Sequence, residues 1–190
     1  MKACQHITNF TSAHESRCHL LGEERLHYPE NHIESDNRLA WFLGRLDKRY
    51  GDDAIYVHLK RDRGATAHSY AKRLFVGGII PSYRISILQK LPNHTSHFDV
   101  ALDYCDTVNE NIEAFLKDKT KKMVFNIETA EQDFRKLWHL CGAEGDLQAA
   151  LAEFRTLHNA SGPKPVALAI RLMEKAQRIF IRLPDFIRYT

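Results

Sequence analysis

Residues 56–73, YVHLKRDRGATAHSYAKR, have the pattern of a strand followed at once by a helix. The apolar run Ala54–Leu59 is short, as is typical of a strand buried in a parallel sheet, and we expect a helix over Gly64–Phe75. Arg61 ends the strand, and Ser69 follows eight residues later inside the helix. A guanidinium binds phosphate oxygens in pairs, and a helix start adds free N–H groups and a favourable dipole. The segment therefore predicts a binding site for a phosphate-sized anion.

Two further strands are expected outside this unit. Lys2–Ile7 is a candidate first strand, and Lys122–Ile127 is another short apolar run. Strands that alternate with helices indicate an α/β fold, with three α/β/α layers and a small, mainly parallel sheet flanked by helices. Ligands of such sheets bind beyond the carboxyl ends of the strands. The helices that we expect, with approximate bounds, are Ala13–Leu21, Asp36–Tyr50, His94–Lys117, Thr129–Cys141, Asp146–Arg155 and Lys164–Leu183.

Polar residues at the starts of these helices predict how they are capped. Asp36, or Ser35 before it, and Asp146 are N-cap candidates, because a short side-chain oxygen can accept a free N–H of the first turn. Thr129 with Gln132 predicts a capping box. Both tryptophans, Trp41 and Trp138, are expected in the core.

The composition bounds the class of protein. The chain has 190 residues, 44% of them hydrophobic, which suits one domain spanning residues 1–190, since single domains contain about 100–200 residues. A net charge of +3 is too small to indicate nucleic acid binding. No apolar run approaches the ~18 residues of a membrane span, and the N-terminus does not resemble a signal peptide. We therefore expect a cytoplasmic protein without membrane contact, whose four cysteines are reduced and which holds no metal.

Arg61, Asp62 and Ser69 resemble the 3′-phosphate-binding motif of the PAPS-dependent sulfotransferases. In that family a strand ends on an arginine, an aspartate or asparagine follows, and a serine comes eight positions after the arginine. Arg63 stands where the family usually has proline. The stretches Asp133–Trp138, Gly145–Leu147, Ala150–Ala152 and His158–Ser161 are similar to the C-terminal helices of small bacterial sulfotransferase-like proteins, so the resemblance covers about half of the chain.

The resemblance implies a P-loop-like fold and PAPS as cofactor, with adenosine 3′,5′-bisphosphate as product and no metal. The family's phosphosulfate loop corresponds to residues 11–15. Ser12 matches the loop, Ala13 replaces its glycine, and His14 and Glu15 replace its threonines. The cofactor-binding residues implied are Thr11, Ser12, Ala13, His14, Arg61 and Ser69.

Sulfuryl transfer to a hydroxyl needs a base and a cation near the reacting oxygens. His14 is the first candidate base, and Arg17 could replace the missing cation of the loop. His32, Glu34 and Asp36 precede a helix and could reach the acceptor side. We therefore expect a sulfotransferase that acts on a hydroxyl or amine of a small or polymeric acceptor.

Two other functions stay open. One is a non-catalytic protein that binds a nucleotide phosphate or a partner on the same fold. The other is a different P-loop-related transferase or kinase, against which the missing G-x-x-x-x-G-K-[ST] sequence counts. A homodimer through the expected C-terminal helix is a further possibility, because that helix carries Ile170, Met173, Ile179, Phe180 and Phe186.

Overall fold

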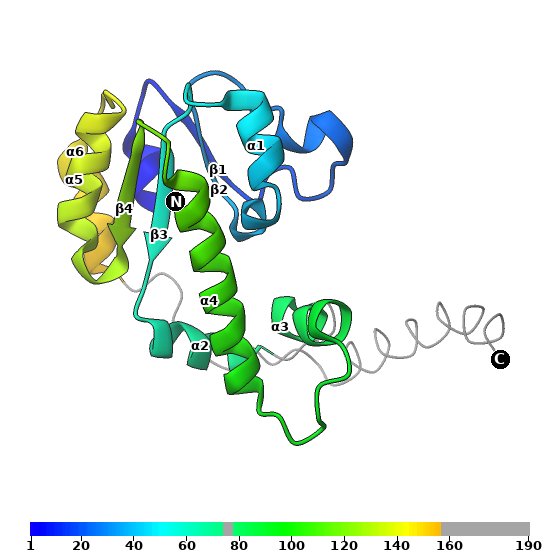
Figure 1. Ribbon diagram of the computed structural model, residues 1–190. Helices are drawn as coiled ribbons and strands as arrows, with labels where there is room; N and C mark the ends of the chain where they lie inside the picture. Colours follow the sequence, from blue (N-terminus) through cyan, green and yellow to red (C-terminus); the bar gives the residue numbers. More distant parts are fainter. Residues whose placement is uncertain (74–77, 157–190) are drawn as a thin grey trace, which may run out of the picture.

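The computed structural model describes residues 1–73 and 78–156. Its strands form two parallel pairs (Figure 1). β1 (Thr11–His14) pairs with β2 (His32–Ser35), and β3 (Tyr56–Lys60) pairs with β4 (Lys122–Asn126). The α-helices are α1 (Leu43–Tyr50), α2 (Arg63–Ala71), α3 (Ile79–Ser82), α4 (His97–Leu116), α5 (Ala130–Leu140) and α6 (Leu147–Ala152). The 3-10 segments are η1 (Lys2–His6), η2 (Gly22–Leu26), η3 (Asn37–Trp41), η5 (Ile127–Thr129) and η6 (Glu153–Arg155), and η4 (Tyr83–Leu88) is a π-helix.

Helices cover both faces of the β3–β4 pair, which confirms the predicted α/β class. α5 and α6 lie on one side of the pair, and α4 runs along the other (Figure 1). His58 on β3 is buried and its Nε2 lies 2.8 Å from Oδ1 of Asn109 on α4. Phe125 on β4 is buried toward α5 and α6. Within the described residues, however, the strands make two separate small sheets instead of the single sheet expected.

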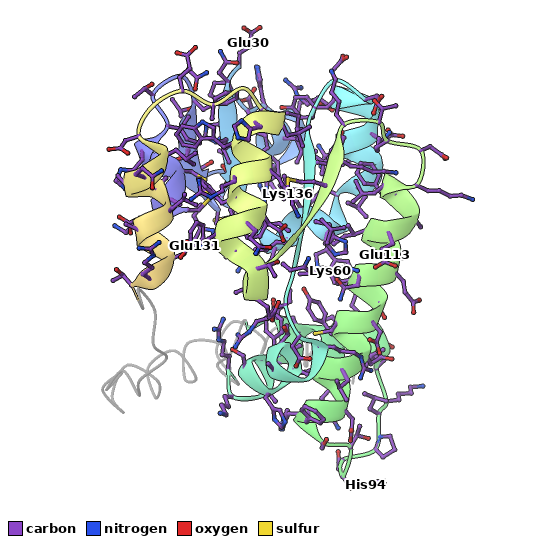
Figure 2. The ribbon with its side chains drawn as sticks, turned by 90° about the vertical axis from the view of Figure 1, so that its left-hand side faces the viewer. Glu30, Lys60, His94, Glu113, Glu131 and Lys136 are labelled. Atoms are coloured by element: carbon purple, nitrogen blue, oxygen red, sulfur yellow. The ribbon has the colours of Figure 1, made fainter. Side chains whose placement is uncertain are left out.

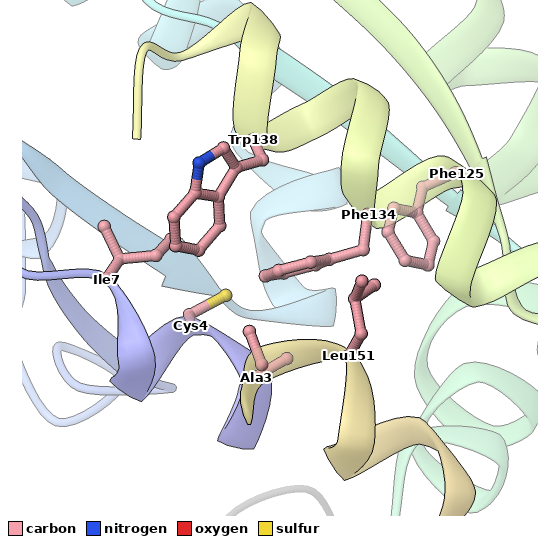
Figure 3. Packing of buried hydrophobic residues seen from close by; sticks show 8 residues of the cluster. Ala3, Cys4, Ile7, Phe125, Phe134, Trp138 and Leu151 are labelled. Atoms are coloured by element: carbon pink, nitrogen blue, oxygen red, sulfur yellow. The ribbon is translucent and has the colours of Figure 1, made fainter. Parts of the chain in front are cut away.

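Two apolar clusters hold the helices in place. The first joins the N-terminal segment η1 to β4, α5 and α6, with Trp138 buried as expected (Figure 3). Its members are Ala3, Cys4, Ile7, Phe125, Phe134, Trp138, Ala150 and Leu151. The second joins α2, α3 and η4 to α4 and contains Ala67, Ile80, Tyr83, Val100, Ala101, Tyr104 and Cys105. Trp41 lies beside this second cluster but is 42% exposed, so the prediction that it is a core residue is wrong.

The predictions for β3, α2, α4, β4 and α5 are confirmed within a few residues. The two predictions for the N-terminal residues are wrong. Lys2–Ile7 is not a strand, because a single 3-10 turn already buries Ala3, Cys4 and Ile7 against α5 and α6. Ala13–Leu21 is not a helix, because Thr11–His14 pairs with β2 and Glu15 then takes a positive φ of 51°.

The capping predictions have mixed outcomes. Asp36 and Asp146 are N-caps as expected, and they accept hydrogen bonds from the backbone N–H groups of Arg38 and Ala149. Thr129 makes no capping box, because its hydroxyl donates to Asp133 Oδ2 instead. The helix expected over Asp36–Tyr50 divides into η3 and α1 at Phe42, while the one expected over Lys164–Leu183 lies outside the described residues.

Candidate functional site

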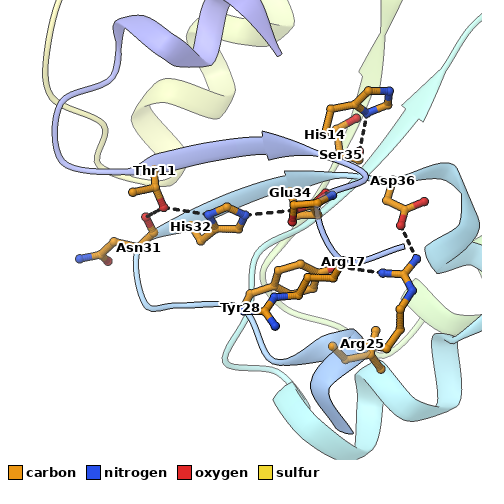
Figure 4. A network of polar contacts seen from close by, with 12 residues as sticks. Thr11, His14, Arg17, Arg25, Tyr28, Asn31, His32, Glu34, Ser35 and Asp36 are labelled. Carbon is orange, nitrogen blue, oxygen red and sulfur yellow. Dashed lines mark hydrogen bonds and ion pairs between the residues drawn. The ribbon is translucent and has the colours of Figure 1, made fainter. Parts of the chain in front are cut away.

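One face of the β1–β2 pair carries a network of side-chain hydrogen bonds (Figure 4). Thr11 is in register with His32, and Ala13 is in register with Glu34. Because side chains alternate along a strand, these four lie on one face of the pair. Ile33 points the other way and packs against the cluster around Phe125. Ile33 therefore anchors the pair to the core, and Thr11, His32 and Glu34 lie on its other face.

Hydrogen bonds link Thr11, His32 and Glu34 in a chain. Thr11 Oγ1 lies 2.8 Å from His32 Nδ1, and His32 Nε2 lies 3.1 Å from Glu34 Oε2. An ionised carboxylate can only accept, so Nε2 of a neutral His32 carries the proton and Nδ1 is the acceptor for the Thr11 hydroxyl. The basic nitrogen of the imidazole therefore faces a hydroxyl, and a carboxylate fixes the tautomer.

Glu34 is itself held in place by Ser16. The backbone N–H of Ser16 donates to Glu34 Oε1 at 3.0 Å, and its hydroxyl donates to Oε2 at 2.5 Å. The side chains of His32 and Glu34 are only 8% and 6% exposed. Tyr28 stacks on His32 with ring centroids 5.6 Å apart and planes 7° from parallel. These contacts leave the imidazole little freedom to rotate. Thr11, at the other end of this chain of hydrogen bonds, is exposed.

A buried ion pair lies beneath this network. Arg25 on η2 donates to Asp36 at the end of β2, and both side chains are almost completely buried. Burial lowers the pKa of the Arg25 guanidinium, but its hydrogen bond to Asp36 and the charge of that carboxylate raise the pKa above its ordinary value. Burial also raises the pKa of Tyr28, whose hydroxyl accepts from Arg25 at 3.4 Å. The pair ties η2 to β2 and so holds Tyr28 over His32.

The predicted anion site lies at the end of β3. Its two neighbouring cations are paired: Lys60 with Glu113 at 2.5 Å, and Arg63 with Asp106 through two hydrogen bonds of 2.6 and 2.5 Å. Figure 2 shows the first pair between β3 and α4. Arg61 is exposed and makes no hydrogen bond or ion pair within residues 1–73 and 78–156. Among the described residues, therefore, no carboxylate neutralises this guanidinium.

The start of α2 offers fewer free N–H groups than the sequence led us to expect. Asp62 caps the helix and accepts the N–H of Ala65 at 2.7 Å, and Glu128 accepts the N–H of Asp62 at 2.8 Å. Ser69 lies further along α2 and is half-buried, and its hydroxyl has no partner in the described part of the chain. An anion here would be held by the side chains of Arg61 and Ser69.

The expected phosphosulfate loop is a strand. Thr11, Ser12, Ala13 and His14 are all residues of β1, so their backbone takes part in sheet pairing instead of forming a cradle. His14 is exposed, and its Nδ1–H donates to the Ser35 carbonyl at 2.6 Å. A turn over residues 15–19 follows β1 directly.

Arg17, the predicted replacement for the cation of the loop, lies in this turn. It donates to the Glu24 carbonyl at 3.0 Å, and its guanidinium lies 5.7 Å from the Tyr28 ring centroid. Arg17 and His14 both lie around the β1–β2 network, whereas Arg61 and Ser69 belong to the β3–α2 unit.

Contacts of η3 connect these two units. Arg38 pairs with Glu15 at 2.6 Å, just after β1, and Asn37 Nδ2 donates to the Tyr70 hydroxyl at 3.4 Å, next to Ser69. The segment between β2 and α1 thus touches both the end of β1 and the helix that carries Ser69.

Sequence reasoning missed β2 and the roles of Ser16 and Tyr28. The alternation of His32, Ile33 and Glu34, polar on either side of an apolar residue, is the pattern of a half-buried strand and could have revealed β2. The contacts of Ser16 and Tyr28 have no sequence signal, because they depend on how the turn after β1 folds over β2.

Residues 1–73 and 78–156 contain no group of three or more His, Cys, Asp or Glu side chains that could hold a metal ion. No helix in the same ranges is long and apolar enough to cross a membrane. No protein-family model matches the chain, and neither a curated protein nor a solved structure matches it.

Proposed function

We propose that this chain binds a 3′-phosphorylated adenosine nucleotide at the end of β3 and acts as a sulfotransferase with PAPS as the donor. The observation that carries the proposal is the availability of Arg61. Its neighbours Lys60 and Arg63 are each neutralised by a carboxylate, whereas Arg61 has no partner among the described residues. An exposed arginine at the carboxyl end of a parallel strand is suited to bidentate binding of a phosphate.

In this proposal Arg61 binds the 3′-phosphate and the Ser69 hydroxyl donates a further hydrogen bond. The carboxylates of Asp62 and Glu128 occupy two of the backbone donors nearby, and their negative charge opposes the bound phosphate. Glu128→Gln keeps an acceptor for the N–H of Asp62 and removes one of these charges. We expect this variant to bind the nucleotide more tightly than the unmodified protein.

One observation favours a second candidate, a protein that binds the nucleotide without transferring sulfate. Thr11–His14 pair with β2, and the turn after them gives the Ser16 donors to Glu34. A phosphosulfate group would have to compete with this carboxylate for the same donors. Binding of the 3′-phosphate would then persist without a site for the reacting group.

The first test is a thermal shift with adenosine 3′,5′-bisphosphate. A ligand at 100 times its Kd stabilises the folded state by about 2.7 kcal/mol, so specific binding raises Tm measurably. Arg61→Ala should remove the shift. Arg63→Ala removes the same charge two positions away and should retain most of the shift. No shift at millimolar ligand would contradict nucleotide binding.

A second measurement separates the two candidates. Transfer of labelled sulfate from PAPS to a panel of hydroxyl and amine acceptors supports the sulfotransferase. Binding of the bisphosphate without transfer to any acceptor supports the non-catalytic protein. A shift with ATP and Mg²⁺, but not with the bisphosphate, would instead support a kinase or related transferase.

A further inference from the structure

We propose that Thr11, His32 and Glu34 form a second, nucleotide-independent site that hydrolyses activated carboxylic esters through an acyl group on Thr11. The three side chains have the connectivity of a nucleophile, a base and an orienting carboxylate. This activity needs no nucleotide and uses neither Arg61 nor Ser69, the residues assigned to the 3′-phosphate.

The positions of the protons suit this role. Glu34 accepts the Nε2–H of His32, so the lone pair of Nδ1 faces the Thr11 hydroxyl at 2.8 Å. Ser16 donates twice to Glu34 and keeps the carboxylate in position. The stack with Tyr28 keeps the imidazole plane fixed. The base is therefore already oriented toward the oxygen that it would deprotonate.

The three hydrogen-bonded side chains also differ in exposure in a way that suits this role. His32 and Glu34 are more than nine-tenths buried, whereas Thr11 is exposed and can be approached from solvent. Asn31 lies next to Thr11, with its backbone carbonyl accepting the Thr11 N–H at 2.9 Å and its own φ at +50°. Asn31 is exposed as well, so solvent borders Thr11 on this side too.

The reaction balances without a cofactor. Thr11 Oγ1 attacks the acyl carbon while His32 Nδ1 takes its proton, and a new C–O bond forms. The bond from the acyl carbon to the leaving alcohol breaks, and His32 returns the proton to that oxygen. Water then attacks the acyl-Thr11 ester with His32 as base, releasing the carboxylic acid and restoring Thr11. The net change is ester plus water to acid plus alcohol.

The first experiment uses the full-length protein and a fluorophosphonate, which phosphonylates activated hydroxyls. We expect one label per chain, located on Thr11 by mass spectrometry, and no label after heat denaturation. Labelling elsewhere, or no labelling of the folded protein, would overturn the proposal. This measurement needs no substitution, so it does not depend on a variant that folds.

The second experiment follows p-nitrophenyl acetate hydrolysis in a Cys18→Ser background, because the exposed thiol of Cys18 would itself react with the ester. Thr11→Val and His32→Asn should each lower the rate by about 100-fold or more, as expected for loss of a nucleophile or its base. Thr8→Val and His19→Asn are matched controls at exposed positions and should leave the rate unchanged.

The pH profile distinguishes catalysis from a purely structural role of His32. The rate of the Cys18→Ser parent should follow the neutral form of one imidazole, and His32→Asn should abolish that dependence. If Thr11→Val and His32→Asn fold, as judged by circular dichroism, and hydrolyse the ester at the unmodified rate, the proposal is wrong.

Discussion

The two parallel strand pairs of this molecule are stabilised in different ways. β3–β4 lies between helices, and it buries His58 toward α4 and Phe125 toward α5 and α6. No residue of β1 or β2 is fully buried, and side-chain hydrogen bonds cross the pair instead. Packing thus accounts for β3–β4, whereas polar contacts account for much of β1–β2.

This difference suggests that β3–β4 supports the fold and that β1–β2 carries the reactive groups. A buried apolar pair makes a rigid scaffold but leaves few polar groups to react. The β1–β2 pair has the opposite balance, and the positive φ angles of Glu15 and Asn31 lie directly after β1 and before β2. Such conformations are found often at functional sites, although asparagine tolerates them well. The polar side chains and the positive φ angles both indicate that reactive groups lie on β1–β2.

The largest expected effect tests the polar support of β1–β2. Asp36→Ala leaves the buried Arg25 guanidinium without its partner and removes the cap of η3, so it should cost about 3–5 kcal/mol in unfolding free energy. Urea denaturation measures this loss. Asp53→Ala removes an exposed carboxylate and should change stability by less than about 0.5 kcal/mol.

The double variant Arg25→Met with Asp36→Leu sharpens this test. It replaces both charges by apolar side chains, and we expect it to be more stable than Asp36→Ala alone. If Asp36→Ala is as stable as the unmodified protein, β1–β2 does not depend on its polar contacts.

The β3–β4 half was predictable because its signals are local. Ala54–Leu59 and Lys122–Ile127 are apolar runs of strand length, and the period of α4 is clear in the sequence. The place of Arg61 at the end of β3 was also predictable, because Arg61 directly follows the apolar run and Ser69 comes eight residues later.

The β1–β2 half was not predictable in this way. Thr11–His14 has almost no apolar content, and its strand conformation depends on pairing with His32–Ser35, about twenty residues away. The hydrogen bonds of Glu34 depend in turn on the positive φ of Glu15. A glutamate at position 15 does not predict a positive φ. The proposed Thr11–His32–Glu34 site therefore emerges only from the tertiary structure.

A core truncation tests the apolar support of the other half. Leu151 on α6 is 1% exposed in the cluster around Phe134, so Leu151→Ala should cost about 3 kcal/mol through lost burial and the cavity that remains. Leu140→Ala at a 43% exposed position of α5 is the matched control and should cost well under half as much. Equal losses in urea denaturation would contradict the assignment of this core.

A smaller effect is expected where the N-terminal segment meets the turn before α6. Gly145 has a φ of 127°, and a Cβ there would lie 2.2 Å from the His6 carbonyl oxygen. Gly145→Ala should therefore cost about 2 kcal/mol through backbone strain and displacement of the Ile7–Gly145 bridge. Gly44→Ala, in open space within α1, should instead stabilise by about 0.5–1 kcal/mol. Opposite signs in thermal denaturation are the expected result.

The smallest effect is a pH dependence that belongs to β3–β4. Burial lowers the pKa of His58, so the folded state disfavours the imidazolium. Stability from this group is complete above the unfolded pKa of about 6.5 and is lost as the pH falls toward the folded value. The unfolding free energy should therefore decrease between pH 7.5 and pH 5.

His58→Gln isolates this contribution, because glutamine does not titrate and can still donate to Asn109. The lowered pKa of Asp133, caused first by its hydrogen bond from Lys136, acts with the same sign but only below about pH 4, outside this range. Urea denaturation of the variant should therefore show a shallower decrease from pH 7.5 to pH 5. An unchanged decrease would assign the effect to other histidines, and the buried imidazole of β3 would then have no part in it.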